Sequence, residues 1–156
     1  MKSGGLLVDT NLLVLLTVGI VNRARIDTFK RTSRYTKSDF ELLRRVIAKF
    51  STLYTVAHIL AEVSNLTDLP GTELARARRV LKGAISALDE VAVPSVRASE
   101  DPLYRDLGLV DAAIGTVARA HNCTVLTDDF DLYHRLSRDR VDAINFARLR
   151  AQQWGI

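Results

Sequence analysis

Five acidic side chains stand at positions from which they could act together. Two apolar runs end in aspartate, the first at Asp9 and the second at Asp128 and Asp129. Asp111 stands at the start of a run with helical spacing, and Glu62 lies within another. Carboxylates that converge on one point raise one another's pKa, so a cluster of them is stable at neutral pH only around a cation. Hard oxygen ligands of this kind suit Mg²⁺ or Mn²⁺.

A divalent cation held by carboxylates can support phosphodiester hydrolysis. It lowers the pKa of a bound water and stabilises the charge of an in-line displacement at phosphorus, so no nucleophilic Ser, Cys or His is needed. His58, His121 and His134 are scattered along the chain, and we interpret them as surface or packing residues rather than zinc ligands. The sequence has no glycine loop of the kind that cradles phosphates, which agrees with a site that holds no nucleoside triphosphate.

Each carboxylate also has a simpler interpretation. Asp111 could cap a helix or lie in its first turn, and Asp9 and Asp129 could form turns after strands. Glu62 could be solvated or paired with an arginine, but its spacing from Ile59 predicts a place near the core-facing stripe, where an unpaired carboxylate is costly. The metal hypothesis therefore rests on the combination of acids and not on any one of them.

Predicted strands and helices alternate along the chain, which indicates an α/β fold with a parallel sheet covered on both faces. Ser38, with Glu41 as its capping-box partner, and Thr72 are the expected helix N-caps. Residues 23–37 are polar and basic, and we predict a loop there. The predicted strands are 5–9, 53–56, 91–93, 124–127 and 141–146, and the predicted helices are 12–21, 38–50, 57–66, 72–88, 111–121, 130–136 and 147–153.

Length and composition describe one globular domain. The 156 residues fit a single core, and 47% hydrophobic with 26% charged residues exclude a disordered chain. The single cysteine, Cys123, can form no internal disulfide and fits a reducing cytoplasm. Asp9 and Asn11 interrupt the apolar stretch at 6–20, so we expect neither a signal peptide nor a membrane span.

Basic residues are concentrated in two parts of the chain. The net charge of +4 weakly favours polyanionic partners, and the cations gather at 23–49 and 76–82. Either cluster alone is equally well explained as a solvated helix face, but two clusters beside an acidic set favour phosphate contacts. The cations that we predict to bind nucleic acid are Arg23, Arg25, Lys30, Arg31, Arg34 and Lys37.

Four short motifs, in this order, resemble those of the PIN domain family. In length and motif order the chain is similar to the small VapC-type ribonuclease toxins of that family. The resemblance implies one PIN-like nuclease domain over 1–156, with a three-layer α/β/α fold around a central parallel sheet of about five strands. It also implies cleavage of single-stranded RNA with Mg²⁺ or Mn²⁺. The motifs are Val8-Asp9-Thr10-Asn11, Leu60-Ala61-Glu62-Val63, Leu109-Val110-Asp111-Ala112-Ala113-Ile114 and Val125-Leu126-Thr127-Asp128-Asp129-Phe130.

The resemblance also implies roles for the individual acids. Asp9, Glu62 and Asp111 would be the main metal ligands, and Asp129 would be the fourth acid of the catalytic set. Asp128 would substitute for Asp129 as a ligand or lie behind it. These roles predict that side chains distant in the chain meet at one end of the sheet.

Two polar side chains and several partners complete what the resemblance implies. Asn11 and Thr127 would orient the carboxylates or the metal-bound water through hydrogen bonds. The expected partners are RNA, single-stranded or structured, a second copy of the chain in a homodimer and, for a toxin, an antitoxin protein. The basic stretch at 23–49 is longer than the small toxins carry, which weakens the toxin role more than the chemistry.

Other functions fit parts of the sequence. A phosphatase of the haloacid-dehalogenase type also begins with an apolar strand that ends in Asp, but it needs a second Asp where Asn11 stands. A PIN-like fold without catalysis would be an RNA- or protein-binding module, and the presence of all four acids argues against it. A flap-type nuclease would cut DNA with the same fold and metal chemistry, and the sequence does not separate RNA from DNA.

Overall fold

The fold is built around one parallel five-stranded sheet with the order β3-β2-β1-β4-β5. A computed structural model describes the backbone of residues 2–155 and the side chains of residues 4–155. All neighbouring strands run parallel, which confirms the α/β fold predicted from the sequence. The strands are β1 (Lys2–Val8), β2 (Phe50–Thr55), β3 (Asp89–Glu90), β4 (Thr124–Thr127) and β5 (Ala143–Asn145).

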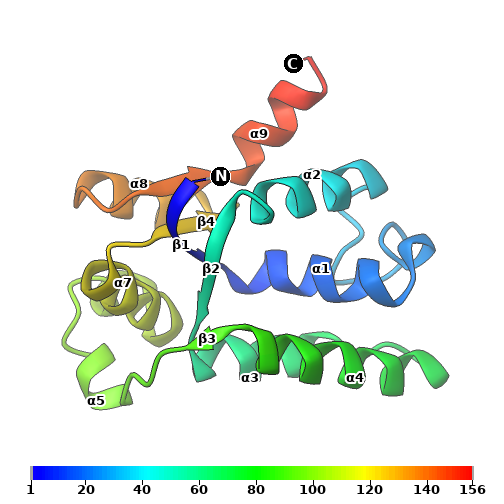
Figure 1. Ribbon diagram of the computed structural model, residues 1–156, viewed down its shortest axis with the longest axis horizontal. Helices are drawn as coiled ribbons and strands as arrows, with labels where there is room; N and C mark the ends of the chain where they lie inside the picture. Colours follow the sequence, from blue (N-terminus) through cyan, green and yellow to red (C-terminus); the bar gives the residue numbers. More distant parts are fainter. Residues whose placement is uncertain (1, 156) are drawn as a thin grey trace.

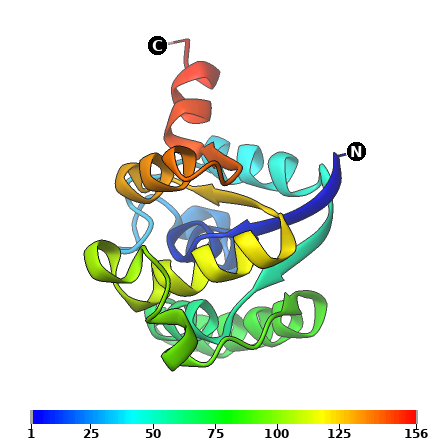
Figure 2. The ribbon, with the colours of Figure 1, turned by 90° about the vertical axis from the view of Figure 1, so that its left-hand side faces the viewer.

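Helices cover both faces of the sheet and give the molecule three layers. In Figure 1, α1 to α4 lie on one side of the sheet, and α5, α7 and α8 lie on the other. Figure 2 looks onto the second side, where α7 crosses in front of the sheet and α9 projects from the body. The helices are α1 (Thr10–Val21), α2 (Lys37–Ile47), α3 (Ala57–Leu66), α4 (Thr72–Ala87), α5 (Ser95–Ala98), α6 (Tyr104–Leu107), α7 (Leu109–His121), α8 (Phe130–Arg138) and α9 (Phe146–Gln153), with a 3₁₀ turn, η1, at Arg23–Arg25.

The apolar runs of the sequence form the centre of this arrangement. Leu6, Leu7 and Val125 are completely buried, because β1 and β4 are interior strands with both faces covered. Helix α1 is apolar on most of its surface because it packs against α2, α3 and α4 as well as the sheet side of the core. None of the helices in the described residues is both long enough and apolar enough to cross a membrane.

The order in which the chain adds strands to the sheet reverses between the neighbours β1 and β4. From β1 it proceeds to β2 and β3 on one side, and it then returns to add β4 and β5 on the other side of β1. Val8 pairs with Leu126 in the β1–β4 register, so the residues that follow these two strands emerge side by side. The backbone N–H of Asp9 donates to the carbonyl oxygen of Leu126 at 2.9 Å. Crevices outside the carboxyl ends of strands at such a reversal are the usual ligand sites of open α/β sheets.

Two predicted helix caps are wrong by one or two residues. Thr36, not Ser38, caps α2, because Thr36 and Asp39 form a reciprocal capping box: each side chain accepts a hydrogen bond from the other residue's backbone N–H. Gly71 caps α4 in a conformation with φ of +62°, and Thr72 is the first helical residue. Phe50, predicted at the end of a helix, begins β2.

The strand predicted at 91–93 is also wrong. The strand that pairs with β2 is β3, whose Asp89 and Glu90 lie opposite Tyr54 and Thr55. Val91 adds one hydrogen bond from its N–H to the carbonyl oxygen of Thr55, and the chain then leaves the sheet edge. The alternation of Val and Ala suggested a strand, but a strand is defined by its neighbour, and β2 ends at Thr55.

Candidate functional site

Asp9 joins the central strand to the first helix, and its carboxylate has a fixed orientation. It follows β1 and caps α1, and Oδ1 accepts a hydrogen bond from the N–H of Thr10 at 2.7 Å. Oδ2 accepts one from the hydroxyl of Thr127 at 2.6 Å. The residue is buried. Its carboxylate is therefore held from two sides, by its own helix and by the end of the neighbouring strand β4.

A polar pocket of about 350 Å³ opens beside Asp9. Four of the five acids singled out in the sequence line it, although they lie up to 120 positions apart in the chain, between Asp9 and Asp129. They come from the end of β1, from α3, from the first turn of α7 and from the turn after β4. The residues that line the pocket are Asp9, Thr10, Asn11, Glu62, Leu66, Leu107, Leu109, Val110, Asp111 and Asp129.

Asp111 has a strongly perturbed pKa. It is the third residue of α7, so it occupies the first turn of that helix. Burial, together with the negative charges of Asp9, Asp129 and Glu62, raises its pKa to about 7. An ordinary first-turn aspartate would be ionised well below that pH, so Asp111 is more than a solvated helix residue.

The pKa of Asp9 is raised as well. Burial is the main cause, and the hydrogen bonds from Thr127 and Thr10 oppose it. The charges of Asp128 and Asp129 add to the increase. Two neighbouring acids therefore carry negative charge that the described protein groups compensate only in part, which is the electrostatic setting of a cation site.

Glu62 lies at the pocket but not where its spacing predicted. The buried residues of α3 are Ile59, Leu60 and Val63, and Glu62 is exposed at the side of this stripe. Its Oε1 accepts a hydrogen bond from the hydroxyl of Thr10 at 3.1 Å. The argument that Glu62 is a carboxylate near the core and so needs a metal was therefore wrong. Glu62 is assigned to the site only because it lines the pocket.

Thr127 connects two of the acids. Besides donating its hydroxyl hydrogen to Asp9, its Oγ1 accepts a hydrogen bond from the N–H of Asp129 at 3.0 Å. The Asp129 carboxylate caps α8, because Oδ1 accepts from the N–H of Leu132 at 3.1 Å. Since Thr127 is fully buried, it fixes the turn after β4 relative to the end of β1.

Asp128 points away from the pocket. Its Oδ2 accepts hydrogen bonds from Arg34 at 3.0 Å and from the hydroxyl of Tyr35. The side chain is only 7% exposed. In this structure Asp128 is thus the ion-pair partner of the basic segment, and Asp129 is the acid that faces the pocket.

Most of the cations expected to bind nucleic acid are paired within the protein. The ion pairs are Arg23–Glu41 at 2.7 Å, Arg25–Glu73 at 2.6 Å, Lys30–Asp68 at 3.4 Å and Arg34–Asp128 at 3.0 Å. Arg31 and Lys37 are exposed and form no ion pair among the described residues. Of the paired cations, Arg34 lies beside the turn that carries Asp129.

The donor atoms of the pocket fit a hard divalent cation. In the described part of the chain, no three Asp, Glu, His or Cys side chains are arranged so that they could hold one ion without moving. The pocket nevertheless presents four carboxylates, together with the oxygens of Thr10 and Asn11, and its lining includes no imidazole or thiol. Binding of an ion therefore requires the carboxylates to rotate toward it, and the charge of the ion would offset their mutual repulsion.

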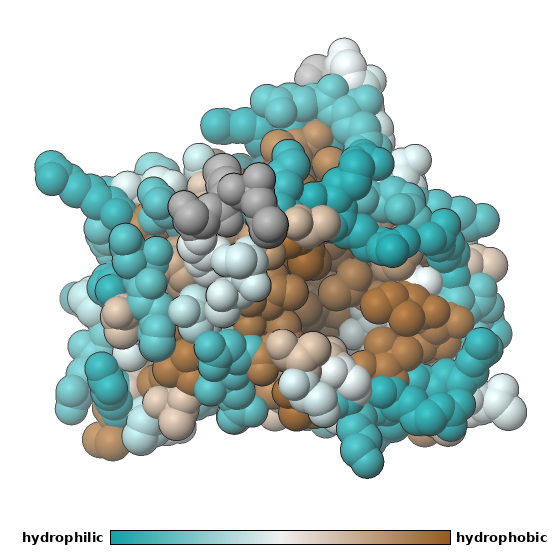
Figure 3. Space-filling view, viewed as in Figure 1, coloured by the Kyte–Doolittle hydropathy of each residue, from teal (hydrophilic) through white to brown (hydrophobic). Residues whose placement is uncertain are grey.

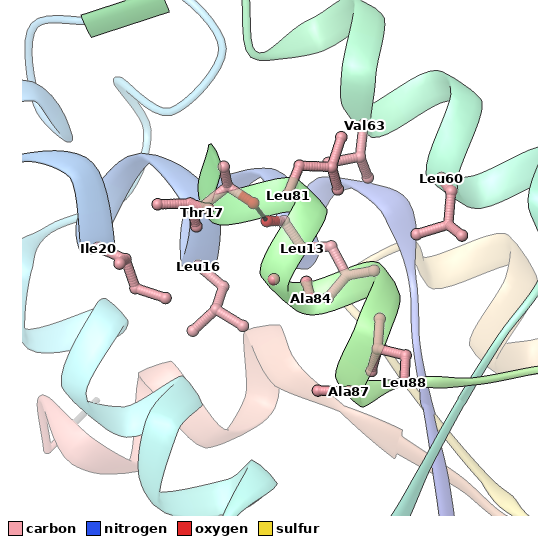
Figure 4. A pocket seen from close by; sticks show the side chains of 12 residues that line it. Leu13, Leu16, Thr17, Ile20, Leu60, Val63, Leu81, Ala84, Ala87 and Leu88 are labelled. Carbon is pink, nitrogen blue, oxygen red and sulfur yellow. Dashed lines mark hydrogen bonds between the residues drawn. The ribbon is translucent and has the colours of Figure 1, made fainter. Parts of the chain in front are cut away.

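A second pocket, between α1 and α4, is apolar and unsuited to this chemistry. Figure 4 shows aliphatic side chains facing it from α1, α3 and α4, and Figure 3 shows the brown hollow on that face of the molecule. Its volume is about 270 Å³. No titratable group lines it, so of these two pockets the acidic one is the candidate for metal-dependent chemistry. The lining residues are Leu13, Leu16, Thr17, Ile20, Leu60, Val63, Val80, Leu81, Gly83, Ala84, Ala87 and Leu88.

Sequence reasoning missed two residues of the site region. Thr10 follows a strand-ending aspartate, so its position next to Asp9 was a usable signal, but its bond to Glu62 depends on the placement of α3. Tyr35 carried no signal, because it lies in the predicted loop and its partner Asp128 is 93 positions away. The apolar wall of the pocket, from Leu66, the end of α6 and the start of α7, also follows from tertiary packing.

A family model agrees with the fold. The model of the PIN domain matches residues 6–138, which is most of the chain and includes all four pocket acids. The chain therefore belongs to the PIN domain family, whose fold is of the nuclease type and whose members are generally metal-dependent nucleases. No curated protein matches the sequence significantly.

Proposed function

We propose that the protein is a metal-dependent endoribonuclease that cleaves phosphodiester bonds of single-stranded RNA. The observation that carries the proposal is that Asp9, Glu62, Asp111 and Asp129 line one pocket at the carboxyl ends of β1 and β4. Family membership supports the same class of reaction, because PIN domains are generally metal-dependent nucleases.

The four acids would hold Mg²⁺ or Mn²⁺. A divalent cation bound there supplies Lewis-acid polarisation of the scissile phosphate and of a water. Asp9 is the best-prepared ligand, because the hydroxyl of Thr127 and the N–H of Thr10 already fix its two oxygens. Asp129 keeps one oxygen on the N–H of Leu132 and leaves the other for the pocket.

Two neutral side chains would assist the acids. Asn11 is exposed and lines the pocket, so its amide can donate a hydrogen bond to a phosphate oxygen or orient a carboxylate. Thr127 favours the ionised form of Asp9 by donating to its carboxylate, as an outer partner of a metal ligand does. The carboxylates leave the pocket negative without an ion, so a bound cation would reduce the repulsion between these acids and the RNA backbone.

Cleavage of labelled oligonucleotides tests the proposal. Purified protein would be incubated with single-stranded RNA or single-stranded DNA of the same sequence, with Mn²⁺ or with EDTA. We expect cleavage of RNA that requires Mn²⁺ and is lost in Asp9→Asn, whose fold the thermal transition should show to be intact. The matched control is Asp131→Asn, which removes an exposed carboxylate from the first turn of α8 without touching the pocket.

Each outcome decides between the alternatives. Equal cleavage by the wild type and Asp9→Asn would identify a contaminant and overturn the proposal. Binding of RNA without cleavage would replace it with a binding module. Cleavage of DNA but not RNA would keep the chemistry and overturn the substrate.

A further inference from the structure

Arg34 is held at the edge of the acidic pocket by two side chains. Its Nη2 donates a hydrogen bond to the hydroxyl of Tyr35 at 2.8 Å and another to Oδ2 of Asp128 at 3.0 Å. The guanidinium also lies over the ring of Tyr35, with its carbon 4.9 Å from the ring centroid. The two hydrogen bonds use one edge of the guanidinium, and the ring contact uses one face. Within the described residues, Nη1 and Nε form no hydrogen bond, and the side chain is 56% exposed.

The two side chains that hold Arg34 are themselves held by packing and hydrogen bonds. Tyr35 is buried, and Asp128 accepts its hydroxyl hydrogen. Arg150 of α9 lies 5.1 Å from the centroid of the Tyr35 ring and donates to the carbonyl oxygen of Arg34 at 2.9 Å. Arg150 in turn pairs with the completely buried Asp39 at 3.0 Å. The segment that carries Arg34 is therefore fastened to α2 and α9 behind it.

The same turn of chain joins this cluster to the acidic pocket. Asp128 lies between Thr127, which donates to Asp9, and Asp129, which lines the pocket. Burial lowers the pKa of Arg34, but the negative charges of Asp128 and Asp129 act on the guanidinium and raise the pKa overall. The free edge of an arginine thus lies next to a site that otherwise presents carboxylates.

We propose that Arg34 binds a non-bridging phosphate oxygen of the RNA backbone beside the acidic pocket, and that Asp128 and Tyr35 are positioning residues that aim its guanidinium. This inference rests on the proposed function. A guanidinium held by one edge can offer its other edge to a phosphate, which a lysine in the same place could not do. Of the six cations predicted to bind nucleic acid, Arg34 is the one whose contacts tie it to the turn that carries Asp129.

The direction in which Asp128→Asn changes the affinity for RNA distinguishes this proposal from a purely long-range electrostatic effect. Asp128→Asn removes a negative charge close to the binding surface, so long-range attraction alone predicts tighter RNA binding. If Asp128 aims Arg34, the same substitution should weaken binding, because the guanidinium loses its ionic partner. Tyr35→Phe, which changes no charge, should weaken binding in the same direction by a smaller factor.

The experiment measures binding of a fluorescein-labelled single-stranded RNA by anisotropy at fixed salt in EDTA, together with Mn²⁺ affinity by calorimetry and thermal unfolding of each variant. We expect Arg34→Gln to weaken RNA binding about tenfold and leave Mn²⁺ affinity unchanged. Arg34→Lys should bind RNA as weakly as Arg34→Gln does, because a lysine offers no planar edge to the phosphate. The control is Arg138→Gln, which removes an equally exposed arginine from the far end of α8. In the Arg34→Gln background, Asp128→Asn should weaken binding no further.

The inference is overturned if Arg34→Gln binds RNA as Arg138→Gln does, or if Asp128→Asn binds more tightly than the wild type. Because binding is measured in EDTA, these results do not depend on cleavage. Absence of cleavage by the wild type would count against the proposed function, and the contrast between Arg34→Gln and Arg138→Gln would still decide the role of Arg34.

Discussion

At the scale of single residues, the buried hydroxyl of Thr127 has the most specific position in the site. It donates to Asp9 and accepts from the N–H of Asp129, so it orients two acids at once. We expect Thr127→Val to lower Mn²⁺ affinity by about 10–100-fold. It should also cost about 1–3 kcal/mol of stability, because Asp9 would be left buried without that donor.

Thr127→Ser is the matched control for this substitution, since it keeps the hydroxyl and removes only a methyl group. Calorimetric titration with Mn²⁺ and urea unfolding of both variants would give the two quantities. A valine variant with the affinity of the serine variant would show that the bond to Asp9 does not matter for metal binding.

Asp111 gives the metal-free protein a characteristic dependence on pH. Its pKa is about 7 in the folded protein and 3.8 as the ordinary value, so the folded state binds more protons between these values. The contribution of Asp111 to the free energy of unfolding is therefore fully present below about pH 4, and it is lost as the pH rises through 7. After a discount for partial exposure, the loss should be roughly 1–2 kcal/mol.

Urea unfolding in EDTA at pH 5 and pH 8 would measure this effect. We expect Asp111→Asn to lose less stability than the wild type between these two pH values, and Asp131→Asn to behave as the wild type. An Asp111→Asn variant with the full pH dependence of the wild type would contradict the assigned pKa. Saturating Mn²⁺ should remove most of the difference, since the ion stabilises the ionised form.

The residues of the pocket were predictable to different degrees. Asp9 and Asp129 follow apolar strands, and parallel strands bring their carboxyl ends to one edge, so their meeting could be argued from sequence. Glu62 was expected near the core stripe and is exposed instead, because a spacing of three residues does not fix the side of a helix on which a residue lies. The orientation of Asp128 depends on Tyr35, and no local pattern relates two residues 93 positions apart.

At the scale of elements, a buried ion pair and an exposed hydrogen bond, from Arg45 to Gln153 at 3.1 Å, attach α9 to α2. Arg150 pairs with Asp39 at 3.0 Å, and their side chains are 17% and 0% exposed. Arg150→Met would leave the carboxylate of Asp39 buried with only the N–H of Thr36 as a partner. We expect a loss of about 3–5 kcal/mol in urea unfolding, the usual consequence of breaking a buried pair on one side.

Arg148→Met is the control, since it removes an exposed arginine from the same helix. The double variant Arg150→Met, Asp39→Leu should recover part of the stability, because no charge remains buried. If the single variant at Arg150 were no less stable than the control, the ion pair would not be what holds α9 to α2.

Helices and strands with a clear pattern in their own residues were predicted well. Those whose position depends on a neighbouring strand or residue were not. The segments that became β1, α1, α3 and β4 have continuous apolar runs or clear helical spacing, and their predicted bounds are close to the observed ones. The edge strand β3 is two residues long and exists because β2 lies beside it, so its position could not be predicted from Val91 to Val93. The α2 cap was misplaced because Ser is the stronger cap residue by type, whereas the capping box with Asp39 selects Thr36.

At the scale of the whole molecule, the strand order determines where chemistry can occur. The reversal between β1 and β4 opens a crevice at their carboxyl ends, and α3 and α7, which contact each other, bring Glu62 and Asp111 to it. The sequence indicated the layered parallel sheet, but the depth and contents of the crevice follow from helix packing. The central claim is that this crevice holds a divalent cation.

Anomalous diffraction from crystals grown at pH 8 with millimolar Mn²⁺ is the most direct test of that claim. We expect an anomalous peak in the pocket, within bonding distance of Asp9 and of at least one of Asp111, Asp129 and Glu62. The same crystals of Asp9→Asn should lack it. A map that shows Mn²⁺ at other surface carboxylates, and no peak among these four acids, would contradict the account.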